Sequence, residues 1–215
     1  MESLPYYLRQ QGRELCSRVG IGRPGGYRIL LLHAALVAVF GVYIPWLKGV
    51  DFLDPVITAA YACLGILFAA PAAAQAFAND NPISMPDVIA RIVMAVLYGE
   101  IIAVTVLICG FGTVYLTHSR HFVVAPALDT LVAAGLLGIT GSFALAAAAA
   151  WITLRFSANA ARGAMRVVFL LMLLVFFYRS RWLPDVADTA ALVCFVIAAA
   201  EFLALRRLVV ASSSQ

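Results

Sequence analysis

Charged residues are scarce in this sequence. Lysine, arginine, aspartate and glutamate make up 12% of its 215 residues, whereas hydrophobic types make up 64%. Soluble globular domains are typically about 25% charged and about 45–50% apolar. A soluble domain of this size still exposes much of its surface, so it could not bury such an excess of apolar side chains. The shortage of charge therefore excludes an ordinary soluble fold and favours an integral membrane protein.

Motifs for cofactors and catalysis are also missing. The four cysteines form no Cys-x-x-Cys pair, so we expect neither a zinc site nor a disulfide framework. No His-Glu-x-x-His motif and no Gly-x-x-x-x-Gly-Lys-Ser/Thr phosphate loop occurs. His118 and His121 are three residues apart, but no third metal ligand is evident. We therefore expect no bound metal, no cofactor and no enzymatic activity in this chain.

Long apolar runs take the place of the missing charge. A membrane-spanning helix needs roughly 20 apolar residues, and the chain has room for about six. We predict an all-α, polytopic membrane protein in which residues 1–28 form a cytoplasmic amphipathic helix and turn, residues 29–206 the transmembrane domain, and residues 207–215 a cytoplasmic tail. The predicted spans are 29–47, 56–78, 88–116, 126–154, 163–183 and 187–206.

The few cations are distributed unevenly between the loops. With six spans and a cytoplasmic N-terminus, four cations fall outside, namely Lys48, Arg120, Arg179 and Arg181. Eleven fall inside, namely Arg9, Arg13, Arg18, Arg23, Arg28, Arg91, Arg155, Arg162, Arg166, Arg206 and Arg207. Cytoplasmic loops of membrane proteins carry the excess of Lys and Arg, so both termini are predicted to be cytoplasmic. The net charge of +4 is explained by this bias, and nucleic-acid binding is not expected.

The segment before the first span has the pattern of an amphipathic helix. Leu4, Leu8, Leu15 and Val19 recur at helical spacing, and the charged residues lie elsewhere around the helix. Such a helix is predicted to lie on the inner membrane surface rather than to cross the bilayer.

The inner loop over residues 80–91 has signals for a helix start. Ser84 can cap a helix, Pro86 suits its first turn, and Asp87 suits its positive end. We expect a short turn along the membrane surface that leads into the third span. An ordinary connecting loop remains the alternative.

This order of elements resembles the membrane subunit of ABC-2-type transporters. That family has six spans, cytoplasmic termini, an amphipathic connecting helix before the first span and a coupling helix between spans two and three. The segment Asn81-Pro-Ile-Ser-Met-Pro-Asp-Val88 is similar to that coupling helix, although the usual basic residue after the serine is missing. The segment Leu154–Arg162 is similar to the family's link into the fifth span.

The resemblance implies a permease subunit in the cell (inner or plasma) membrane. Transport by alternating access would be driven by a separate ATP-binding cassette subunit, and the permease would pair with an identical or different second half. Force from the ATPase would reach the amphipathic helix at 4–19 and the coupling segment. The coupling residues it implies are Pro82, Ile83, Ser84, Met85, Pro86, Asp87 and Arg91.

Three of the ionisable residues inside predicted spans are singled out as candidates, and all three fall in the inner half of the bilayer. They are His33, Glu100 and Glu201. Ionisable groups within the bilayer are costly and are functional candidates by default. We hypothesise that the three face the bundle interior as one polar cluster. The alternative is that each is satisfied locally, with Glu201 extending toward water.

Two other functions are alternatives to a permease subunit. A non-transporting structural or assembly subunit of a larger membrane complex would explain the short loops and the small residues of the fourth span. An intramembrane enzyme would need converging polar residues, whereas the sequence offers isolated ones.

Overall fold

The computed structural model describes residues 3–19, 26–78, 84–119, 128–157, 159–161, 163–165, 167–168, 170–171 and 183–212. Within these ranges the chain is helical apart from short turns, and no strand occurs. Five helical stretches there are long and apolar enough to cross a membrane, which confirms the all-helical membrane class. The predicted span at 163–183 lies largely outside the described residues. The five stretches are Leu31–Leu53, Pro55–Ala78, Met85–His118, Thr130–Arg155 and Asp185–Val210.

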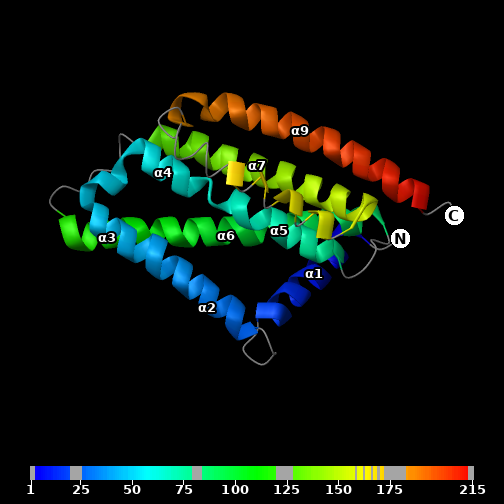
Figure 1. Ribbon diagram of the computed structural model, residues 1–215, viewed down its shortest axis with the longest axis horizontal. Helices are drawn as coiled ribbons and strands as arrows, with labels where there is room; N and C mark the ends of the chain where they lie inside the picture. Colours follow the sequence, from blue (N-terminus) through cyan, green and yellow to red (C-terminus); the bar gives the residue numbers. More distant parts are fainter. Residues whose placement is uncertain are drawn as a thin grey trace.

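The long helices lie side by side in one bundle (Figure 1). Helix α7 (Leu128–Arg155) packs against α9 (Leu183–Ser212) and against α5 (Gly65–Ala78), which also packs on α6 (Met85–His118). Helices α7 and α9 run in the same direction, and both chain termini lie at one end of the bundle (Figure 1). We call this end the N/C end and the other the far end.

Helix α6 is apolar on both its buried and its exposed sides. Its exposed side carries Leu97, Ile101, Val104 and Ile108 at helical spacing, and Ile101 and Ile108 are each 64% exposed. A helix that is apolar all round, yet is not enclosed by protein, suits a hydrocarbon environment. The exposed stripe on α6 is therefore the surface expected to face lipid.

Small side chains let the helices of the bundle approach closely. The largest buried cluster contains Ala69, Ala73, Ala147 and Ala150, all fully buried between α5 and α7. A Cβ added at Gly138 of α7 would lie 2.6 Å from the carbonyl oxygen of Ala62. Close backbone approach through Gly and Ala is the usual packing mode of transmembrane helices.

The first span changes helix type along its length. It comprises α2 (Gly26–Leu36), the π-helix η1 (Val37–Tyr43), α3 (Ile44–Lys48) and the 3₁₀ helix η2 (Gly49–Leu53). Pro45 has no N–H to donate to the Gly41 carbonyl four residues earlier, so this hydrogen bond of an α-helix is missing. The Thr113 hydroxyl of α6 donates to that carbonyl at 3.1 Å.

Gly49 marks the turn at the end of this span. It is the only residue with positive φ in the described part of the chain (φ 58°, ψ −131°), a conformation that L-residues avoid. A Cβ added there would also lie 3.1 Å from Cε1 of His118.

Gly49→Ala is expected to destabilise the protein by about 1–2 kcal/mol because of this backbone strain. The midpoint of unfolding in mild detergent measures the effect. Gly135→Ala is the matched control, because no heavy atom lies within 4 Å of its added Cβ. Equal midpoints for the two variants would contradict the expectation.

The second span is divided into two helices. Helix α4 (Pro55–Ala62) is capped by Asp54, whose Oδ1 accepts from the Val56 N–H at 2.8 Å. A turn at Cys63 and Leu64 then separates α4 from α5, which begins at Gly65. No residue pattern within the predicted span 56–78 indicates this division.

Two boundaries differ from the sequence-based prediction. Residues 84–91 are the N-cap and first turns of α6 itself, rather than a separate surface turn, because Ser84 and Pro86 start the long helix directly. Helix α9 extends beyond the predicted 187–206 at both ends, so residues 207–212 belong to a helix rather than to the predicted tail. Arg206 and Arg207 have exposed side chains within this helix and do not end it.

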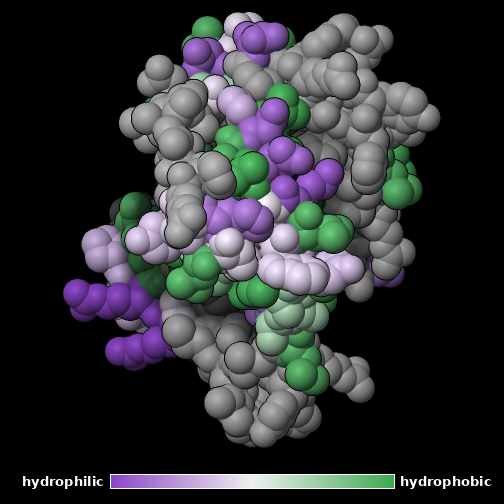
Figure 2. Space-filling view, turned by 90° about the vertical axis from the view of Figure 1, so that its left-hand side faces the viewer, coloured by the Kyte–Doolittle hydropathy of each residue, from purple (hydrophilic) through white to green (hydrophobic). Residues whose placement is uncertain are grey.

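Charge is concentrated at the ends of the bundle. Figure 2 looks onto the far end, where hydrophilic residues gather across the middle of the face. Exposed charged residues there are Lys48, Asp51, Asp54, Asp185 and Asp188. Those at the N/C end are Arg9, Arg13, Arg155, Arg206 and Arg207.

Candidate functional site

Asp87 and Arg91 form a buried ion pair at the start of α6. They are one turn apart, with Nη2 of Arg91 at 2.9 Å from Oδ2 of Asp87 and Nε donating to Oδ1 at 3.2 Å. Asp87 is 2% exposed and Arg91 7% exposed. A two-point guanidinium–carboxylate contact fixes geometry as well as charge. The pair is therefore a rigid polar centre in an otherwise apolar bundle.

Arg91 also attaches α6 to the end of α5. Its Nη1 donates to the carbonyl oxygen of Ala76 at 2.8 Å, and its guanidinium lies 5.5 Å from the centre of the Phe77 ring. Ala76 is in the last turn of α5, where carbonyls have no intrahelical donor and a positive charge is favourable. Arg91 thus ties the end of span two to the start of span three.

Helix α1 (Leu4–Val19) docks onto the same place. The Gln11 side chain donates to Oδ1 of Asp87 at 3.5 Å, and a Cβ added at Gly12 would lie 3.7 Å from Cε of Met94. Tyr7 is the most buried side chain described on α1. Leu4, predicted to share the apolar face, is 37% exposed. The face of α1 that contacts α6 is instead centred on Tyr7 and Gln11, next to the predicted apolar face.

The other predicted coupling residues have lesser roles in this geometry. Ser84 occupies the N-cap of α6 with extended backbone, and its carbonyl accepts from Val88 N–H at 3.1 Å. Its hydroxyl makes no capping bond and is buried without a partner among the described residues. Met85 packs at the edge of the large alanine-rich cluster, and Pro86 is in the first turn. Pro82 and Ile83 lie outside the described residues.

A second polar centre lies deep in the bundle at Glu100. The hydroxyl of Ser142, a fully buried residue of α7, donates to Oε1 of Glu100 at 2.7 Å. The carboxyl group lies against Gly65, where an added Cβ would be 2.7 Å from Cδ of Glu100. Glu100 therefore touches the first residue of α5, at the positive end of that helix.

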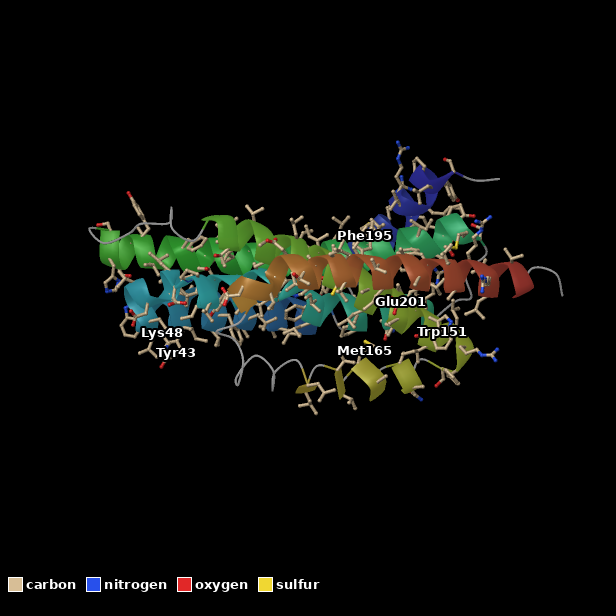
Figure 3. All side chains as sticks on the ribbon, turned by 90° about the horizontal axis from the view of Figure 1, so that it is seen from above. Tyr43, Lys48, Trp151, Met165, Phe195 and Glu201 are labelled. Carbon is tan, nitrogen blue, oxygen red and sulfur yellow. The ribbon has the colours of Figure 1, made fainter. Side chains whose placement is uncertain are left out.

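The three predicted intramembrane residues have separate neighbours. Glu100 is paired with Ser142, whereas the His33 ring meets the Tyr98 ring edge-on at 5.4 Å. Glu201 lies on α9 between the buried Ala198 and Leu205, and its Oε2 is buried without a hydrogen-bond partner in the described part of the chain. In Figure 3 Glu201 projects from α9 toward the side that carries Trp151 and Met165.

Sequence reasoning missed the partners of both centres. Ser142 is 42 residues from Glu100, and Ala76 is 15 residues from Arg91, so neither pairing follows from local spacing. The available signal was general: a carboxyl in an apolar span needs a donor, and Ser142 is a polar residue in the small-residue-rich span α7.

The chain was compared with models of protein families, with curated proteins and with solved structures. It matches none of them.

Proposed function

We propose that this chain is the permease subunit of an ABC-2-like transporter, in which a separate ATP-hydrolysing subunit drives the movement of the spans. The observation that carries the proposal is the junction of α1, the end of α5 and the start of α6 around Asp87 and Arg91. Force applied to α1 or to the start of α6 would reach two spans at once through buried polar contacts.

The distribution of charge supports six spans with cytoplasmic termini. Exposed arginines gather at the N/C end, whereas the far end carries four exposed aspartates and Lys48. The positive-inside rule then assigns the N/C end to the cytoplasm. Because α7 ends at the N/C end and α9 begins at the far end, the chain returns across the bundle between Arg155 and Leu183 (Figure 1). A sixth span of roughly 20 residues fits that interval.

In this proposal the ATPase meets α1 and the start of α6 from the cytoplasm. Arg9 and Arg13 are exposed on α1 and offer positive charge to an acidic surface of the partner. A partner shifts an equilibrium between two arrangements only if it contacts them differently. Closing of two ATPase subunits would move the junction and favour one arrangement of the spans, and a second permease half, identical or different, would complete the pathway.

Co-purification tests this function. The tagged chain is extracted from its native membrane in mild detergent, and its partners are identified and quantified. We expect an ATPase with a phosphate-binding loop at equal stoichiometry, and we expect Arg9→Glu with Arg13→Glu to release it. Arg206→Glu with Arg207→Glu is the control at the same end of the bundle, and it should retain the partner. Recovery of other membrane proteins without an ATPase would refute the proposal in favour of a structural subunit.

A further inference from the structure

The division of the second span has no proline at the break itself. Cys63 has φ −86° and ψ −1°, at the edge of the right-handed helical region, and ends α4. The bonds across the turn connect residues three apart: Leu64 N–H to the Tyr61 carbonyl at 3.2 Å, and Ile66 N–H to the Cys63 carbonyl at 3.2 Å. Such 3₁₀ bonds in mid-helix often mark a hinge.

The two halves of the span are packed into different parts of the core. In α4, Ala59 and Ala62 pack with Ala134 of α7, and Tyr61 packs with Phe52 at a ring distance of 4.9 Å. Most buried side chains of α5 belong instead to the large alanine-rich cluster near the N/C end. Each half therefore has its own partners, and the turn between them is the element that a relative movement would bend.

Helix α6 lies against the first residue of α5. Gly65 lies against α6, where its carbonyl faces Gly99 and its Cα faces the Glu100 carboxyl. The bond from Ser142 to Glu100 then joins α7 to α6 beside this residue. Breaking that bond would free the Glu100 carboxyl that lies against Gly65, without disturbing a contact within α4 or α5.

We propose that the turn at Cys63 and Leu64 is a hinge at which α5 tilts relative to α4, and that the Glu100–Ser142 pair is the latch that holds it in this arrangement. Glu100 and Ser142 are positioning residues in this role. The hinge is independent of the transport function, because its test uses the isolated chain.

Hydrogen exchange of the purified protein in lipid nanodiscs tests the hinge. Amides of residues 65–68 are expected to exchange about tenfold or more faster than those of residues 97–103 in the adjacent part of α6, because local opening sets the rate. Gly99 and Gly65 are in contact, so the two segments lie at the same depth in the bundle. Equally slow exchange in both segments would overturn the hinge.

Two variants test the latch. Ser142→Ala and Glu100→Ala should each accelerate exchange at residues 65–68 by a further factor of about ten, the order expected for loss of one intramolecular hydrogen bond. Thr140→Ala is the control, because its hydroxyl donates to the Leu136 carbonyl of its own helix at 2.8 Å and should leave residues 65–68 unchanged. No acceleration in Ser142→Ala, or an equal acceleration in every span, would overturn the latch.

Discussion

Replacing Gly99 with alanine is expected to force α5 and α6 apart. The added Cβ would lie 3.0 Å from the backbone nitrogen of Ala69 and closer still to the carbonyl oxygen of Gly65. Both are backbone atoms of a helix, so neither can rotate away as a flexible side chain would. We expect a loss of about 2–3 kcal/mol in the free energy of unfolding, measured by denaturation in mild detergent.

Gly112→Ala is the matched control in the same helix. A Cβ added at Gly112 meets no heavy atom within 4 Å. Alanine has a higher helix propensity than glycine by up to about 1 kcal/mol, so this variant should be neutral or slightly more stable. If the two variants had the same stability, the close approach of α5 and α6 at Gly99 would not be a determinant of the fold.

The helices themselves could be predicted from sequence, because apolar length alone decides whether a segment suits a bilayer. The amphipathic helix at residues 4–19 was likewise predictable, since its pattern is local, and its observed bounds confirm it. Ser84, Pro86 and Asp87 indicated that a helix starts here, because they act within one turn, but not that this helix is the third span itself. Each of these features depends on residues that are near one another in the chain.

What could not be predicted depends on the rotation and axial position of one helix against another. The pairing of Glu100 with Ser142 requires α6 and α7 to meet at one particular register, and an apolar helix that is similar on all sides gives no signal for its register. The break at Cys63 likewise has no local cause as strong as Pro45 in the first span. It is found where Gly99 and Gly138 bring α6 and α7 against α5 and α4.

For the same reason, the sequence indicates Asp87 and Arg91 as parts of a loop motif but does not reveal the junction around them. Their spacing of four residues predicts a pair on one helix face. It does not reveal that the Ala76 carbonyl and the Gln11 amide lie on the same pair. The burial of the pair, rather than its spacing, makes its loss costly to the stability of the fold.

Removing one member of this pair is expected to have the largest effect of any single substitution considered. Asp87→Leu leaves the guanidinium of Arg91 buried without its carboxylate, and Arg91→Leu leaves the carboxylate and the Ala76 carbonyl without their donor. Breaking a buried ion pair typically costs about 3–5 kcal/mol, because an uncompensated charge remains. The midpoint of thermal unfolding, followed by size-exclusion chromatography of heated samples, should fall sharply for both variants.

The double variant distinguishes a coupled pair from two separate contributions. With Asp87→Leu and Arg91→Leu together no charge is left unpaired, so the loss should be smaller than the sum of the single losses, by about 1–3 kcal/mol.

Arg91→Lys should lose an intermediate amount of stability, because an ammonium group cannot make the two-point contact with Asp87 while also reaching Ala76. Arg155→Leu, which removes an exposed arginine at the same end of the bundle, should change stability by less than about 1 kcal/mol. Strictly additive losses would mean that the two residues act independently, and the junction would then not be the rigid connection between α1, α5 and α6 that coupling to a partner requires.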